Sequence, residues 1–132
     1  MSSSFRPRSN TKRKGSARYV CVAALFLSIA FDVSAAHFDR VYASENAATL
    51  AEWGKKYEQG RGVRANIGRA IRLYCKAAKK GQATAQYRLG WIYAHGRRGV
   101  KRDDALAVTW FTKAAKQRHI QSRNMLKLVR AK

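Results

Sequence analysis

The 132-residue sequence predicts an all-α fold: a short α-solenoid of two helix-turn-helix repeats followed by a C-terminal capping helix. Three observations carry this prediction. A glycine- and tyrosine-containing motif recurs after 36 residues, the residues that follow it recur after 37, and the last segment repeats the pattern without its glycine. The length allows one small domain, and the mean hydropathy of -0.47 excludes a polytopic membrane protein.

Residues 1–36 are expected to be a cleaved secretory signal peptide. The first 18 residues contain six basic residues and no acidic one, and an apolar run of 13 residues follows. Asp32 ends the run, and Ala35 and Ala36 provide small residues at a cleavage site. The run is too short to span roughly 30 Å of hydrocarbon as a helix, which argues against an uncleaved anchor. The expected location is therefore periplasmic or secreted.

The chain from His37 onward is expected to begin with a lead-in over residues 37–46. It keeps 22 basic and 6 acidic residues, so a net charge near +16 belongs to the mature chain itself. It also keeps one cysteine, Cys75, which cannot form an intramolecular disulfide after cleavage. Because Cys75 falls on a core-facing helix, we expect a buried and inert thiol rather than a bond between chains.

The first repeat occupies about residues 47–82. Its first helix is expected over 45–59, and the turn at 60–62 contains two glycines, which adopt positive φ at low cost. Asn66 is the expected N-cap of a second helix over 67–80. Gly81 is the expected stop of that helix.

The second repeat occupies about residues 83–118, with helices expected over 83–95 and 104–117. Asp103 is the expected N-cap of the latter. One extra arginine lengthens the second turn, where a repeat tolerates insertion. A fifth helix over 119–130 carries Lys127 at the place of the repeat glycine. Residues 119–132 are therefore expected to cap the solenoid.

Gly54 and Gly90 lie in the middle of the first helices, where glycine costs about 1 kcal/mol relative to alanine. A penalty that recurs implies close approach of a neighbouring helix. The side chains of Val63 and Val100 are expected to pack into the core and so anchor the two turns. The aromatic residues that recur with the motif are expected to pack there as well.

The second repeat reads LGWIYAHG over residues 89–96, then GV at 99–100, Asp103, and WFTKAA at 110–115. These residues resemble the Sel1-like repeat, and the first repeat matches the same pattern with Trp53, Asn66 and Leu73 in place of leucine, aspartate and tryptophan. The resemblance covers about residues 47–118. It implies a solenoid related to tetratricopeptide repeats, adaptor or scaffold work that is common in bacterial envelopes, and no catalysis by the repeats.

The residues themselves indicate no catalytic site. The sequence lacks HExxH, CxxC, GxSxG and phosphate-loop patterns, and no His/Cys spacing suits zinc. We therefore expect no catalytic residue, no metal and no cofactor. Some envelope proteins join repeats of this kind to a cell-wall-cleaving transglycosylase domain, so an accessory role to such an enzyme stays open.

A partner-binding groove is predicted on the first helices, which line the concave face of such solenoids. Positions 87, 91 and 95 share one face of their helix, and rings with flanking charges suit an extended peptide or a glycan. The alternative is that Tyr87 and Trp91 pack on the fifth helix. The predicted groove residues are Glu52, Lys55, Tyr87, Arg88, Trp91 and His95.

A basic surface is the second predicted binding feature. It is either a polyanion-binding surface or an ordinary solvated face. An export signal argues against nucleic acid as the partner. The predicted residues of this surface are Arg69, Arg72, Lys76, Lys79, Arg97 and Arg98.

Together these features favour an exported adaptor that mediates protein–protein interaction in the bacterial cell envelope. The rival is a basic binder of anionic envelope polymer, such as peptidoglycan or lipid head groups. Because two repeats and a cap form a small core, we expect either marginal stability of the chain alone or burial against a partner or a second copy, so self-association stays open.

Overall fold

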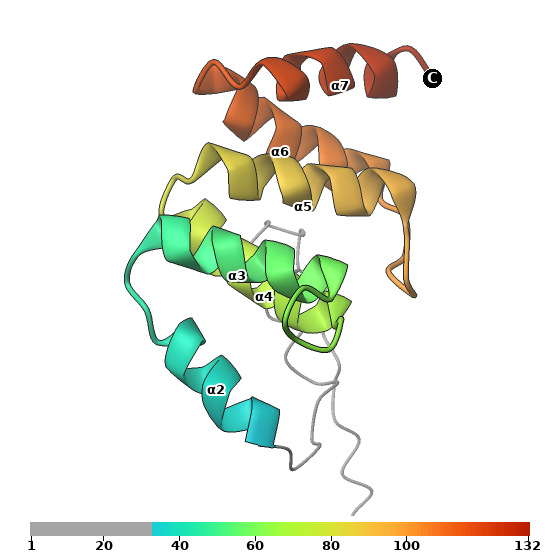
Figure 1. The fold of residues 1–132 in the computed structure, drawn as a ribbon. Helices are drawn as coiled ribbons and strands as arrows, with labels where there is room; N and C mark the ends of the chain where they lie inside the picture. Colours follow the sequence, from blue (N-terminus) through green and yellow to red (C-terminus); the bar gives the residue numbers. More distant parts are fainter. Residues whose placement is uncertain (1–32) are drawn as a thin grey trace, which may run out of the picture.

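The computed structural model describes residues 33–132, which fold into six α-helices without a β-strand. Helices α3/α4 and α5/α6 form two stacked helix-turn-helix pairs, with α2 at one end and α7 at the other (Figure 1). The all-α solenoid is confirmed, and each of the five predicted helices is present with ends within two residues of the prediction. The helices are α2 (Val33–Tyr42), α3 (Ala47–Gln59), α4 (Ile67–Lys79), α5 (Ala83–His95), α6 (Asp104–Lys116) and α7 (Ile120–Arg130).

The side chains expected to cap the second helices do so. Asn66 Oδ1 accepts a hydrogen bond of 2.9 Å from the amide of Arg69, and Asp103 Oδ1 accepts one of 2.9 Å from the amide of Leu106. Each bond satisfies an amide that a helix N-terminus leaves without a partner. Gly60, with φ of 70°, ends α3 in the left-handed conformation that glycine tolerates.

Both turns close through the same backbone hydrogen bond. The amide of Asn66 donates to the Tyr57 carbonyl at 2.8 Å, and the amide of Asp103 donates to the Tyr93 carbonyl at 2.9 Å. The extra residue of the second turn lies between these anchors, where Arg98 has a positive φ of 57°. The insertion therefore leaves the helix pairing unchanged.

The mid-helix glycines permit the close helix approach that the sequence predicts. A Cβ atom on Gly54 would lie 2.7 Å from Cδ1 of Tyr74, and one on Gly90 would lie 2.7 Å from Cδ1 of Phe111. Real Cβ atoms do not approach a ring this closely. Each repeat therefore uses an aromatic ring of its second helix to fill the space above the glycine of its first.

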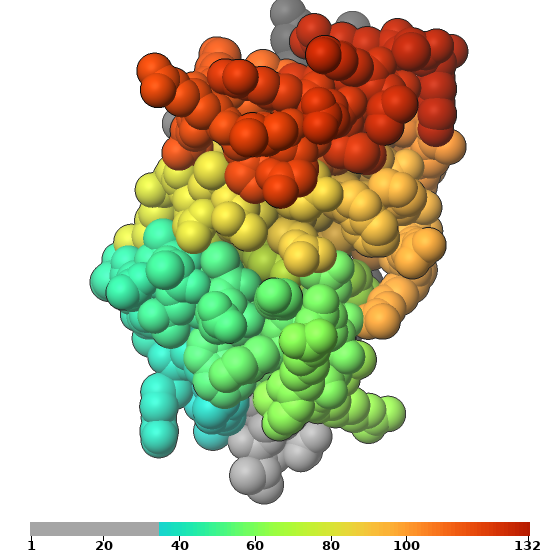
Figure 2. All heavy atoms as spheres, turned by 45° about the horizontal axis from the view of Figure 1, so that its top comes forward, coloured from blue at the N-terminus to red at the C-terminus, as the bar shows by residue number. Residues whose placement is uncertain are grey.

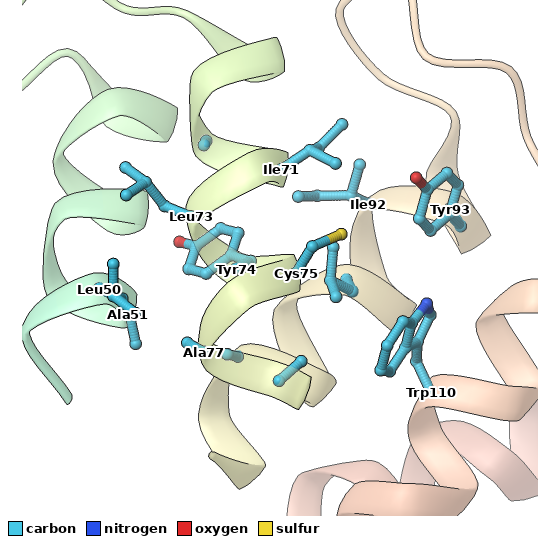
Figure 3. Packing of buried hydrophobic residues seen from close by; sticks show 14 of the residues in the cluster. Leu50, Ala51, Ile71, Leu73, Tyr74, Cys75, Ala77, Ile92, Tyr93 and Trp110 are labelled. Carbon is cyan, nitrogen blue, oxygen red and sulfur yellow. The ribbon is translucent and has the colours of Figure 1, made fainter. Parts of the chain in front are cut away.

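Helix α4 lies at the centre of the core and contributes to both sides of it. Figure 3 shows Leu73 and Tyr74 directed toward α3, whereas Ile71 and Cys75 are directed toward Ile92 of α5. All five side chains are buried. The predicted burial of Cys75 is confirmed, but its sulfur is disulfide-bonded in the structure of the 132-residue chain, so the expected inert thiol is not what the structure contains.

Helix α2 is an element that the sequence did not predict. It spans the expected boundary between the signal peptide and the lead-in, whereas residues 1–32 of that expected signal lie outside the described residues. Phe38 and Val41 of α2 are buried. The Phe38 ring meets the Tyr57 ring edge-on at 5.7 Å between centroids. These contacts join α2 to the first repeat.

Helix α7 covers the opposite end of the solenoid, where Figure 2 shows its atoms forming the outer surface. Ser122, which aligns with buried Ala85 of the second repeat, is itself fully buried against the stack. Lys127 is exposed, while Ile120 and Leu128 keep 68% and 60% of their surface in contact with solvent. Helix α7 thus buries one face and leaves the other open, as expected of a cap.

Candidate functional site

A small hollow of about 100 Å³ lies where the two repeats meet. Its walls come from the end of α3, the start of α4, helix α5 and the second turn. The hollow therefore depends on the relative placement of both repeats. Its lining residues are Glu58, Gln59, Ile67, Trp91, Ile92, Arg97 and Arg98.

Trp91 is the large aromatic side chain in this hollow. Its ring stacks on the His95 ring with centroids 4.1 Å apart and planes inclined by 26°. The Arg97 guanidinium lies 5.3 Å from the centroid of the Trp91 ring, within cation–π range. His95 Nδ1 also lies 2.8 Å from the Trp91 carbonyl oxygen. Trp91 and His95, which helical spacing places on one face, are therefore in contact, and the basic side chain of Arg97 lies over the Trp91 ring.

Glu58 connects the two repeats beside this hollow. Its Oε2 accepts a 2.7 Å hydrogen bond from the Tyr74 hydroxyl, and its Oε1 lies 3.9 Å from Nη1 of Arg88. Its carbonyl oxygen also accepts a hydrogen bond from Arg98. Sequence reasoning missed Glu58. Its place four residues after Gly54, on the same helix face, is the signal that could have found it.

The other predicted groove residues do not all join Trp91. The Tyr87 ring lies 4.9 Å from the His119 ring and 5.9 Å from the Phe111 ring, measured between centroids. Tyr87 thus packs toward the start of α7, as the alternative interpretation expected. Glu52 and Lys55 are exposed on α3. The aromatic stripe is divided between two neighbourhoods.

The residues of the predicted basic surface do not form one surface. The Arg72 guanidinium lies 4.9 Å from the Phe38 centroid, and Lys76 Nζ donates a 2.7 Å hydrogen bond to the Tyr42 carbonyl. Arg69 likewise lies over the Phe38 ring, at 5.3 Å. These three side chains attach α2 to α4. Only Lys79 is exposed on α4, and the two turn arginines belong to the hollow between the repeats.

Burial controls the titration of several side chains. Burial is the larger cause and the Glu58 carboxylate the smaller one, and together they raise the pKa of Tyr74 far above its usual value. Burial and the nearby Asp103 carboxylate raise the pKa of Tyr93 to about 12. Partial burial lowers the pKa of His119. The tyrosines therefore stay neutral hydrogen-bonding groups at physiological pH, and none of these shifts converges on a cleft.

Residues 33–132 contain neither a group of side chains placed to hold a metal ion nor a helix able to cross a bilayer. No group of three or more histidine, cysteine, aspartate or glutamate side chains in this range is arranged to hold a metal ion. None of the helices in the same range combines the length and apolar character needed to cross a bilayer.

Curated relatives match the repeat region and are much longer than this chain. Chitin synthase regulatory factor 3 of Schizosaccharomyces pombe is 37% identical over 75 residues, which are 55% of this chain and 8% of that protein. An F-box protein of Arabidopsis thaliana is 44% identical over 45 residues, which are 33% of this chain and 13% of its own length.

Solved structures share the helix arrangement. A Sel1 repeat protein from Oxalobacter formigenes superposes with a TM-score of 0.56 at 39% identity, covering 58% of this chain and 30% of that one. The protective antigen c5321 of uropathogenic Escherichia coli, which has an SLR fold, gives a TM-score of 0.65 at 24% identity. That match covers 84% of this chain and 24% of the antigen, and it supports the fold alone.

The repeat boundaries agree with the family pattern. The Sel1 repeat model matches residues 47–82 and 83–119, which are the two predicted repeats to within one residue. Repeats of this family generally mediate protein–protein interaction, and their fold is typically a non-catalytic scaffold. With more than half of its length matched, the chain belongs to the Sel1 repeat family.

Proposed function

We propose that this chain is an exported adaptor that binds a protein or peptide partner in the bacterial cell envelope through the hollow between its repeats. The partner would contact the Trp91 ring and the charged groups around it. The export part of the proposal rests on the signal-like pattern of residues 1–36.

One observation carries the binding part: Trp91 is half-buried in a hollow that both repeats build. Its ring is fixed by His95 stacking and by Arg97, so little side-chain entropy is lost when a partner covers it. Tryptophan and arginine are also the residues that most often dominate interface energies. The site therefore has the anchor and the flanking charge that a polypeptide partner requires.

Capture by the full-length chain tests this site. The chain is expressed in a bacterial host, crosslinked in place and isolated from envelope extract with low-salt and high-salt washes. We expect a discrete protein that survives high salt and is lost with Trp91→Ala, but is retained with the matched charge variant Lys79→Gln. Equal capture by the Trp91→Ala variant would contradict the assignment.

Export is tested separately by fractionation and N-terminal sequencing of the chain from that host. We expect the periplasmic or secreted form to begin at Ala36 or His37. Retention of residues 1–32 on a cytoplasmic chain would refute export while leaving the binding site untouched.

A second candidate function, binding of anionic envelope polymer, has its own supporting observation. Residues 105–132 contain seven basic residues and no acidic one. Basic side chains of α6 and α7 in this segment are exposed, including Lys113, Lys116, Arg123 and Lys127. Retention of wall fragments or anionic lipid that falls steeply with salt, and that is unchanged by Trp91→Ala, would favour this function over the adaptor.

A further inference from the structure

A second and larger hollow, of about 450 Å³, lies between α2, α3, the first turn and the start of α4. Among the described residues, none lines both this hollow and the hollow around Trp91. Rings and an aliphatic side chain form part of its wall, two arginines form another part, and the lining residues within 33–132 include no acidic side chain. The side chains used below are those of His37, Trp53, Tyr57, Val63, Arg64 and Arg69.

Trp53 gives this hollow an aromatic wall that the repeat itself does not require. The corresponding residue of the second repeat, Leu89, is fully buried, whereas Trp53 stays half-buried. The edge of the His37 ring meets the Trp53 ring at 4.8 Å between centroids, with planes inclined by 64°. Val63 of the first turn is half-buried beside them. The wall can therefore receive an apolar or aromatic group.

Positive charge lies next to this wall. Arg64 is exposed in the first turn, and the Arg69 guanidinium lies 5.6 Å from the centroid of the Tyr57 ring. Lys56 Nζ lies 4.1 Å from the centroid of the Trp53 ring. A guanidinium can donate two parallel hydrogen bonds to one carboxylate. The exposed Arg64 lies beside an apolar wall whose described lining residues include no acid, and this suits a ligand that carries a carboxylate on an apolar body.

We propose that this hollow binds the carboxyl-terminal residue of a partner polypeptide, with its side chain against Trp53 and its carboxylate at Arg64. A free small molecule is bound best by a site that encloses most of its surface. This hollow instead includes the exposed Arg64 in its lining, which suits a chain end whose remainder lies outside. The inference rests on the proposed adaptor function, but it does not use Trp91.

Titration of the ¹⁵N-labelled full-length chain with N-acetyl-L-phenylalanine tests the site. The sequence has three tryptophans, so each indole N–H serves as a separate NMR probe. We expect the Trp53 resonance to shift with a Kd on the order of 1 mM, while those of Trp91 and Trp110 stay in place. N-acetyl-L-phenylalanine amide, which lacks the charge, should bind about tenfold more weakly.

Two substitutions sharpen the test. Arg64→Gln should weaken binding about tenfold, whereas Arg61→Gln, an exposed arginine of the same turn outside the lining, should not. Trp53→Leu installs the residue of the second repeat and should abolish the ring-dependent binding with the Trp91 and Trp110 resonances unchanged, which shows that the fold is kept.

Any one of the following results would overturn the proposal: an unmoved Trp53 resonance, equal affinity for the acid and the amide, or equal loss of affinity with Arg61→Gln and Arg64→Gln. Free phenylalanine binding as tightly as its N-acetyl form would also refute the chain-end ligand, in favour of a free amino acid. Failure at Trp53 together with Trp91-dependent capture would leave the adaptor function standing without this site.

Discussion

The Tyr74 hydroxyl donates a 2.7 Å hydrogen bond to Oε2 of Glu58, which joins the two helices of the first repeat. Arg88 of the second repeat lies 3.9 Å from the other carboxylate oxygen. One carboxylate thus contacts both repeats. Because Phe111 occupies the place of Tyr74 in the second repeat, the hydroxyl is a feature of the first repeat alone.

We expect Tyr74→Phe to lower the free energy of unfolding by about 1–3 kcal/mol, because a half-buried carboxylate loses a hydrogen-bond donor. The fold should survive, since the second repeat packs with phenylalanine at this place. Urea denaturation followed by circular dichroism measures the change. A double-mutant cycle with Glu58→Gln should show coupling, and strict additivity would contradict the role of this bond.

Gly54→Ala and Gly90→Ala should each destabilise the protein by about 1–3 kcal/mol, because the new methyl group would overlap the Tyr74 or the Phe111 ring. Gly68→Ala is the matched control in α4: its nearest neighbour would be Asn66 Oδ1 at 3.4 Å. That control should be neutral or stabilising, by about 0.5–1 kcal/mol. If thermal melts showed the same loss of stability for all three variants, close helix approach would not explain the glycines.

Stability should fall in alkaline solution as pH rises from about 10 toward 12. The unfolded chain releases its tyrosine protons near pH 10, whereas folded Tyr93, with a pKa of about 12, keeps its proton. A raised pKa stabilises the fold below the unfolded value, and this contribution is lost as pH rises. Urea titrations at several pH values should show a smaller decline for Tyr93→Phe. An identical decline would contradict the shift.

Helix α7 should fray as the solution is acidified from about pH 7 to pH 5. The His119 side chain caps the N-terminus of α7. Its Nδ1 accepts a hydrogen bond of 3.4 Å from the Ser122 amide and lies 3.0 Å from Ser122 Oγ. Burial lowers the pKa of His119. The capping contribution is therefore present above the unfolded value of about 6.5 and is lost as pH falls and Nδ1 becomes protonated.

Amide hydrogen exchange at Ser122 and the residues that follow measures this fraying. His119→Asn keeps an acceptor at the cap without a titrating group, so its protection should be independent of pH over this range. Fraying of the asparagine variant at acid pH would assign the effect to another group.

The repeat helices could be predicted because their signals are local and recur. Gly54 and Gly90 each carry a helix penalty that only close packing offsets, and Asn66 and Asp103 stand where caps are needed. These signals identify the two helix pairs and their turns. The model of the family matches the same boundaries.

Helix α2 could not be predicted because its stability comes from distant residues. Phe38 and Val41 are its buried apolar side chains, and both follow a segment that resembles a leader. The contacts that fix it come from α3, where the Tyr57 ring meets Phe38, and from α4, where Arg72 stacks on Phe38 and Lys76 binds the Tyr42 carbonyl. A sequence pattern shows such basic residues as a charged helix face and does not reveal the rings beneath them.

The sequence predicted only part of the candidate groove, because contacts between residues distant in the chain decide which rings lie together. Helical spacing places Tyr87 and Trp91 on one face, but it does not tell which neighbour each ring meets. Tyr87 packs against His119, which lies 32 positions further along the chain, whereas Trp91 contacts Arg97 of the adjacent turn. Long-range packing, and not periodicity, divides the stripe.

The second turn shows how such a scaffold can be elaborated. Its closing bond between the Tyr93 carbonyl and the Asp103 amide matches that of the shorter first turn, although one more residue lies between the anchors. The length of the second turn can therefore change without changing how the helices of the repeat pair. A designed loop grafted between Arg97 and Gly99 would be displayed beside Trp91 on an unaltered framework, which makes this turn a natural place for new specificity to evolve or to be engineered.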